Sequence, residues 1–106
     1  MYINEIDVQA LSQLRDSGEE YTLVDIRSEL ELSQGGIANA KNIPMNQIPE
    51  HIDSLKHMGK VILYCRSGAR SAHACAYLAS LGLDNIIHLK GGIMAWAQSG
   101  LPLQQI

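Results

Sequence analysis

The run Val61-Ile62-Leu63-Tyr64 constrains the fold of this chain more than any other segment, because all four side chains have apolar character. Such a run predicts a strand that is buried on both faces, as in a parallel sheet. A short loop, residues 65–71, follows it and leads into a helical pattern that stops at Gly82. The segment therefore predicts a strand, a tight loop and a helix in direct succession.

The rest of the chain alternates between strand-like and helix-like segments. The predicted strands are short runs rich in apolar or β-branched residues, at 21–26, 61–64 and 85–89, with a brief extended segment at 40–43. Helices are predicted at 8–17 with Asp7 as N-cap, at 28–34, at 46–59 with Asn46 as N-cap, from the loop to Leu81, and after Gly91-Gly92. This alternation predicts an α/β fold with a mainly parallel central sheet and helices on both faces.

Bulk composition narrows the possible functions. With 106 residues, 46% of them apolar, residues 1–106 are expected to form a single domain. A net charge of -3 and the lack of a basic stripe predict no nucleic acid partner. We find neither a targeting pattern nor a run of about 18 apolar residues, so no membrane partner and a cytoplasmic location are expected.

Cys65 is the candidate nucleophile. It comes directly after the predicted strand and before the N-terminus of the next helix, where unpaired backbone N–H groups and the positive end of the helix dipole favour a thiolate over a thiol. Cys75 lies at helical spacing from Ala72 and Ala79, which predicts a core position. The two cysteines are expected to be separate thiols, because a helix would hold their Cα atoms too far apart for a disulfide.

The loop around Cys65 has the composition of an anion-binding loop. Gly68 permits a tight turn, and its small neighbours leave successive N–H groups free to point inward. Two arginines add positive charge and a serine adds a hydroxyl group at the start of the helix. The candidate binding residues are Arg66, Ser67, Gly68, Ala69, Arg70 and Ser71.

Three groups of motifs, together covering nearly the whole chain, resemble the signatures of single-domain rhodaneses, a family of sulfurtransferases. They are Val24-Asp25-Ile26-Arg27 with Glu31, Gly35-x-Ile37 and Ala40-x-Asn42-Ile43-Pro44; Cys65-x-x-Gly68-x-Arg70-Ser71; and Asn85-Ile86 with Leu89-x-Gly91-Gly92, Ala95-Trp96, Gly100 and Pro102. The resemblance implies a rhodanese-like three-layer α/β/α fold.

The resemblance also implies a double-displacement reaction. Cys65 would take a sulfane sulfur from thiosulfate or a low-molecular-weight persulfide and pass it, as a persulfide, to a thiophilic acceptor. Cyanide, a thiol or a protein thiol, including thioredoxin or a sulfur-carrier protein, are the acceptors expected. No cofactor is expected.

The resemblance assigns roles to the charged residues as well. Arg66 is expected to contact the donor, and Arg70 is expected to brace the loop by pairing with Glu31 or Asp25. Arg27, with Asp25 and Glu31, completes the predicted loop support.

Two alternatives to an enzyme of this kind remain. Cysteine phosphatases and arsenate reductases use a similar loop but generally have five residues between Cys and Arg, whereas Cys65 and Arg70 are separated by four. A four-residue spacing favours a single sulfur atom over a tetrahedral phosphate. A sulfur carrier without turnover, or a binding module of the same fold, could share every residue named above.

The remaining candidates for chemistry are weaker. None of the four histidines pairs with Cys65 in the sequence, and they lack ligand spacing with each other or with the cysteines: His51, His57, His73 and His88. No metal site is therefore expected. Trp96 is predicted to be a core residue.

Overall fold

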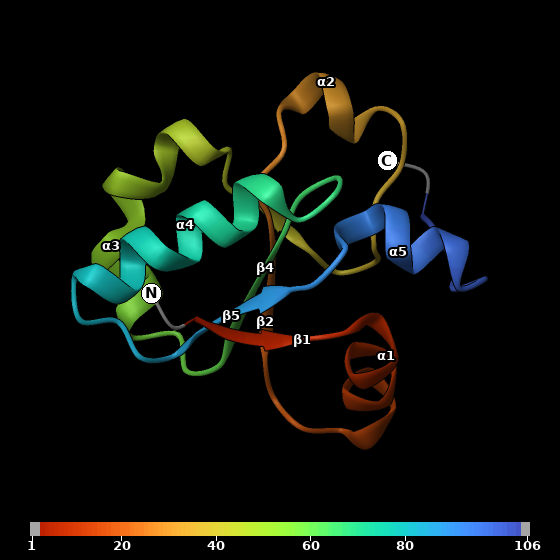
Figure 1. Cartoon of the computed structure of the whole chain (residues 1–106), viewed down its shortest axis with the longest axis horizontal. Coiled ribbons are helices and arrows are strands. Elements are labelled where there is room, and N and C mark those ends of the chain that lie inside the picture. The colour runs from red at the N-terminus through yellow and green to blue at the C-terminus, as the bar shows by residue number, and fades with distance from the viewer. Residues whose placement is uncertain (1–2, 105–106) are drawn as a thin grey trace.

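The computed structural model describes residues 3–104, with a five-stranded sheet at the centre in which every strand pairing is parallel (Figure 1). The order across the sheet is β1-β5-β4-β2-β3. The strands are β1 (Asn4–Ile6), β2 (Thr22–Asp25), β3 (Lys41–Asn42), β4 (Val61–Tyr64) and β5 (Ile86–Leu89). The predicted run at 61–64 is thus the central strand.

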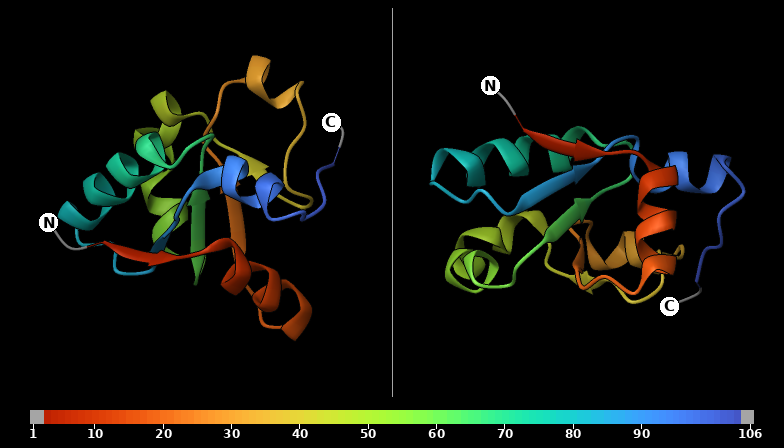
Figure 2. Two further views of the ribbon diagram at one scale, coloured as in Figure 1. Left: turned by 45° about the vertical axis from the view of Figure 1, so that its right-hand side comes forward. Right: turned by 90° about the horizontal axis from the view of Figure 1, so that it is seen from below.

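Helices cover both faces of this sheet. They are α1 (Val8–Ser17), α2 (Glu29–Leu32), the 3₁₀ helix η1 (Met45–His51), α3 (Ile52–Lys56), α4 (Ala69–Ser80) and α5 (Gly92–Gln98). The helices α3 and α4 lie on one side and α1 and α5 on the other, as the views of Figures 1 and 2 agree. The predicted three-layer α/β/α architecture is confirmed.

Alternation along β4 divides the interior into two cores. All four of its side chains are fully buried, and successive ones point to opposite faces of the sheet. The core beneath α3 and α4 contains Val61, Leu63, Leu55 and Leu78, and the core beneath α1 and α5 contains Ile62, Tyr64, Leu11 and Trp96. Deleting one of these buried side chains would cost about 2–5 kcal/mol. The apolar run therefore forms a strand buried on both faces, as predicted.

The edge strand β1 is an element that the sequence analysis missed. It has three residues, two of which are exposed, so it shows neither an apolar run nor a readable alternation. Its stability comes from pairing with β5, in which Glu5 lies opposite His88, and from the Lys90 N–H, which donates to the Ile6 carbonyl at 2.9 Å. Tertiary pairing alone makes this segment a strand.

The prediction of one helix from Asn46 to Gly59 is wrong. The Gln47 N–H donates to the Pro44 carbonyl at 2.8 Å, so the turn begins at Pro44 and not at Asn46. The segment continues as the 3₁₀ helix η1, which contains Pro49, and only five residues form the α-helix α3. Asn46 lies inside η1 and provides no side-chain cap.

The predicted N-cap of α1 is present, and α2 begins with a capping box that was not predicted. Asp7 Oδ1 accepts a hydrogen bond from the Ala10 N–H at 2.8 Å, which caps α1. Ser28 and Glu31 form a reciprocal capping box that starts α2. None of the helices within residues 3–104 combines the length and the apolar character that crossing a membrane requires.

Candidate active site

Cys65 lies at the carboxyl end of the central strand, where parallel α/β sheets place their ligands. Its side chain is buried, and the loop between β4 and α4 folds around the sulfur. The backbone N–H groups of Gly68 and Ser71 donate to Sγ at 3.2 and 3.4 Å, and the Ser71 hydroxyl lies 3.6 Å from it. The predicted convergence of donors on this sulfur is present.

These donors change the acidity of Cys65. Burial raises the pKa of the thiol, but hydrogen bonds from the Ser71 side chain and from the backbone of Ser71, Gly68 and Arg70 outweigh burial, so its pKa is below the ordinary value. A thiolate at this position needs no adjacent general base. Cys65 is thus electronically suited to nucleophilic attack.

The loop presents its side chains outward and its backbone inward. Arg66, Ser67 and Ala69 are exposed, whereas Gly68 is buried. Gly68 has φ +105°, a conformation that favours glycine, and this turn aims its N–H at the sulfur. Arg66 is therefore an exposed cation on the loop, two residues before the glycine that turns toward the sulfur.

Helix α5 supports the loop from behind, through contacts that the sequence analysis did not anticipate. The Ile93 N–H donates to the Cys65 carbonyl at 2.9 Å and the Met94 N–H to the Arg66 carbonyl at 3.0 Å. Gly92 makes this approach possible, because a Cβ atom there would lie 2.4 Å from the Cys65 carbonyl oxygen. The glycine pair 91–92, which the sequence presents only as a turn, lets the helix terminus touch the loop.

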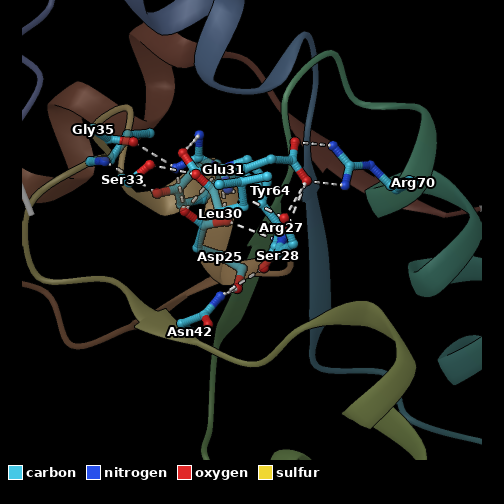
Figure 3. A network of polar contacts seen from close by, with 11 residues as sticks. Asp25, Arg27, Ser28, Leu30, Glu31, Ser33, Gly35, Asn42, Tyr64 and Arg70 are labelled. Carbon is cyan, nitrogen blue, oxygen red and sulfur yellow. Dashed lines mark hydrogen bonds and ion pairs between the residues drawn. The ribbon is translucent and has the colours of Figure 1, made fainter.

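Arg70 braces the loop through Glu31, one of the two partners predicted for it. Its Nη1 and Nη2 atoms donate to Oε1 and Oε2 of Glu31 at 2.7 Å each (Figure 3). Hydrogen bonding to Arg70 lowers the pKa of Glu31 to about 2. Because Glu31 lies on α2 and Arg70 on α4, this bidentate ion pair connects the start of α4 to the segment that follows β2.

Asp25 pairs with Arg27 instead of Arg70. Nε and Nη2 of Arg27 donate to Oδ1 and Oδ2 of Asp25 at 3.0 and 2.7 Å, and both side chains are buried. Arg27 Nη2 also donates to the Gly35 carbonyl at 2.7 Å, so the pair closes the segment that contains α2 (Figure 3). Asp25 and Arg27 therefore support the loop mainly through the placement of Glu31, and the Asp25 charge also contributes to the raised pKa of Arg70.

A histidine that no sequence pattern connected to Cys65 lies behind Ser71. Nδ1 of His88, on β5, is 2.9 Å from the Ser71 hydroxyl oxygen. The signal for it in the sequence was a polar residue two positions after Ile86, on the same buried face of a predicted strand. Only the register of the sheet brings it to the loop.

The structure also locates the second cysteine, the tryptophan and the possible metal ligands. Cys75 is buried in the core under α4, and both cysteines are free thiols. Trp96 is buried, as predicted. Among residues 3–104, no three His, Cys, Asp or Glu side chains are grouped closely enough to hold a metal ion.

Comparison with known proteins agrees with this geometry. The family model of the rhodanese-like domain matches residues 7–99. A sulfurtransferase of Allochromatium vinosum is 46% identical over 101 residues, covering 95% of this chain and 94% of the relative, and a putative sulfurtransferase of Bacillus subtilis is 38% identical over 96 residues, covering 91% and 92%. The crystal structure of a rhodanese-related protein from Thermoplasma volcanium superposes with a TM-score of 0.85 at 35% identity, covering 97% of this chain and 99% of that one.

The chain belongs to the rhodanese-like domain family. At the level of that family its activity is sulfur transfer of the rhodanese type, which makes it a transferase. The resemblance inferred from the three motif groups is confirmed.

Proposed function

We propose that the protein transfers a sulfane sulfur through a persulfide on Cys65. The observation that carries the proposal is the convergence of the Gly68 and Ser71 N–H groups on Sγ of Cys65, at 3.2 and 3.4 Å. Such donors stabilise a negative sulfur without supplying a proton acceptor. The pair Arg70–Glu31 holds the far end of the loop in place.

The reaction consists of two displacements. The Cys65 thiolate attacks the outer sulfur of thiosulfate, an S–S bond forms, and sulfite leaves with the bonding electron pair of the donor. With a low-molecular-weight persulfide as donor, a thiolate leaves instead. An acceptor nucleophile then attacks the outer sulfur of the persulfide, the new S–S bond breaks, and the Cys65 thiolate is regenerated.

The charges near the loop suit this sequence of steps. The exposed Arg66 attracts an anionic donor, and the inward N–H groups stabilise the negative charge of the persulfide. The four residues between Cys65 and Arg70 form a smaller loop than the five that phosphate-transferring cysteine enzymes generally use. We therefore propose sulfane sulfur, carried to cyanide, a small thiol or a protein thiol, as the cargo.

The experiment measures thiocyanate formed from thiosulfate and cyanide, beside hydrolysis of an aryl phosphate by the same preparation. Thiocyanate without phosphate release is the expected result, and a Cys65→Ser variant should form none. Phosphate release without thiocyanate would overturn the proposal.

A separate measurement distinguishes an enzyme from a carrier. Intact mass spectrometry after incubation with thiosulfate should show one extra sulfur atom on the protein, which disappears when cyanide, a dithiol or thioredoxin is added. A persulfide that forms once and is never passed on would identify the protein as a carrier without turnover.

A further inference from the structure

The imidazole of His88 lies directly beneath the Cys65 loop. It is 5% exposed, and a Cβ atom added to Gly68 would lie 3.3 Å from its Cε1 atom. Its two ring nitrogens face different groups: Nδ1 is 2.9 Å from Ser71 Oγ, and Nε2 is 3.9 Å from Oε2 of Glu5 on the neighbouring strand β1. One face of the sheet thus supplies a titratable ring to the back of the loop.

The Ser71 hydroxyl is the point at which this ring can influence the nucleophile. Its single proton has three acceptors within reach: Sγ of Cys65 at 3.6 Å, the Gly68 carbonyl oxygen at 3.2 Å and Nδ1 of His88 at 2.9 Å. A hydroxyl group donates one hydrogen bond at a time and accepts others with its lone pairs. The position of the imidazole proton therefore decides whether His88 takes this hydroxyl proton or leaves it free for the Cys65 sulfur or the Gly68 carbonyl oxygen.

The two neutral tautomers of His88 have opposite consequences. With the proton on Nε2, Nδ1 accepts the Ser71 hydroxyl proton and Cys65 loses that donor. With the proton on Nδ1, the ring donates to Ser71 Oγ, and the hydroxyl is free to donate to the sulfur. The carboxylate of Glu5 is too far from Nε2 for a hydrogen bond and its side chain is 45% exposed, so it holds the Nε2–H form only weakly.

We propose that His88 is a positioning residue for sulfur transfer, and that its Nδ1–H group donates to Ser71 Oγ so that the Ser71 hydroxyl points at the Cys65 sulfur. This inference deepens the proposed persulfide reaction and rests on it. The ring stays neutral near pH 7 because burial, opposed by Glu5, lowers the pKa of His88. The neutral ring therefore carries a single N–H proton, either on Nδ1 or on Nε2.

The arrangement acts at the two moments when Sγ carries negative charge. Sγ is an anion when it attacks the donor, and it becomes one again when the acceptor takes the outer sulfur and Cys65 leaves. In the persulfide between these steps the charge is on the outer sulfur. A hydroxyl that points at Sγ therefore favours both the attacking thiolate and the leaving thiolate, and no proton is transferred in the process.

Ser71 is the route by which a change at His88 can alter the pKa of Cys65. The ring lies near Glu5 on β1 and Ser71 on α4, and the Cys65 sulfur lies on the far side of the Ser71 hydroxyl. The register partner of His88 on β4 is the uncharged Leu63. A change in the Cys65 pKa on altering His88 would accordingly arise through Ser71.

The test compares His88→Asn with His88→Leu, which have similar shapes and differ in the side-chain donor. Asn keeps an N–H group near the place of Nδ1, and Leu does not. The readout is the rate of Cys65 alkylation by iodoacetamide against pH, measured on the Cys65 peptide by mass spectrometry, with Cys75 as the internal reference. In His88→Leu nothing from position 88 donates to Ser71 Oγ, so the hydroxyl is no longer held toward the sulfur and can turn to the Gly68 carbonyl oxygen. We therefore expect His88→Leu to raise the midpoint by about one unit and His88→Asn to stay near the wild type.

A Ser71→Ala background shows whether the effect passes through the hydroxyl. There, His88→Leu should produce no further shift, whereas an equal shift in both backgrounds would overturn the proposal. Equal midpoints for wild type and His88→Leu, or for His88→Asn and His88→Leu, would overturn it as well. Alkylation requires no sulfur donor, so these results do not depend on whether the protein transfers sulfur.

A measurement on the unaltered protein covers the case in which a variant fails to fold. Long-range ¹H–¹⁵N correlation spectra of the imidazole at pH 7 and above identify which ring nitrogen carries the proton. The proton on Nδ1 of His88 is the expected result, and the proton on Nε2 would overturn the proposal.

Discussion

The loop that holds Cys65 and the middle of α4 that holds Cys75 give two equally buried thiols opposite properties. The side chains are 1% and 2% exposed. Hydrogen bonds lower the pKa of Cys65 against the effect of burial, whereas burial, helped by the neighbouring Cys65, raises the pKa of Cys75 to about 12. Burial alone therefore produces an inert thiol, and the Ser71 hydroxyl together with the backbone donors of a strand-to-helix loop produces a reactive one.

The largest expected difference between the two sites is in activity. Cys65→Ser should reduce thiocyanate formation to the background rate, because a hydroxyl group does not ionise near neutral pH, while its melting temperature stays close to that of the wild type. Cys75→Ala should keep most of the activity and lose about 1 kcal/mol of stability from a small cavity. Activity that survives in Cys65→Ser and disappears in Cys75→Ala would reverse the assignment.

The second prediction concerns the helix terminus behind the loop. In Gly92→Ala the new Cβ would lie 2.4 Å from the Cys65 carbonyl oxygen and 2.6 Å from that of Arg66, so the loop must shift. We expect sulfur transfer to fall about 10–100-fold, since misplacement of reacting groups by about 1 Å has effects of that size. Thiocyanate formation under saturating thiosulfate is the measurement.

Gly82→Ala is the matched control for this substitution. Gly82 also has a positive φ, +89°, but an added Cβ would meet nothing within 4 Å. Both variants should lose about 1–2 kcal/mol from the strained backbone, and only Gly92→Ala should lose activity. Equal activities would show that the loop does not depend on this contact.

A third prediction compares how the two thiols affect stability at alkaline pH. The unfolded chain releases the Cys75 proton near its ordinary pKa of 9.0, and the folded chain releases it only near 12, so between these values the folded state binds the extra proton. The free energy of unfolding should therefore fall as pH rises through that window. Urea unfolding between pH 8 and pH 11 should show a steeper fall for wild type than for Cys75→Ala.

Cys65 contributes with the opposite sign. Its folded-state pKa is below the ordinary value, so in the window between the two the unfolded chain binds more protons, and stability rises with pH. Parallel pH profiles for wild type and both single variants would contradict the contrast between the two sites.

The smallest effect is expected from the ion pair that braces the loop. Glu31→Gln keeps an oxygen for the Ser28 capping box but removes the charge that faces Arg70. Both side chains of this pair are partly exposed, so its loss should cost about 0–1 kcal/mol and reduce activity only a few-fold. Glu19→Gln, which breaks the exposed Lys60–Glu19 pair at the end of β4 opposite the loop, should leave activity unchanged.

Acid titration offers an independent check of the same pair. The pKa of Glu31 is lowered to about 2 from its ordinary value of 4.5, so the stability it contributes is complete above pH 4.5 and is lost as pH falls toward 2. The wild type and Glu31→Gln should therefore become equal in stability only at the acid end of that range. A constant difference from pH 5 to pH 2 would show that the pair adds no pH-dependent stability.

The sequence alone determined the parts of this protein that depend on local patterns. Four consecutive apolar residues predicted the central strand, and a cysteine ahead of a helix, followed by a glycine and two arginines, predicted the loop. These features depend on neighbouring residues, because burial on both faces, tight turns and helix termini are all produced within about ten residues of chain.

The tertiary structure decided what depends on contacts between distant segments. The strand β1 forms because it pairs with β5. Arg70 pairs with Glu31 and not with Asp25, and Gly92 approaches the Cys65 carbonyl at the carboxyl end of the central strand. His88 reaches Ser71 only because the parallel register puts the ends of β4 and β5 side by side. Sheet register and helix packing create these contacts, and neither is encoded in a local run of residues.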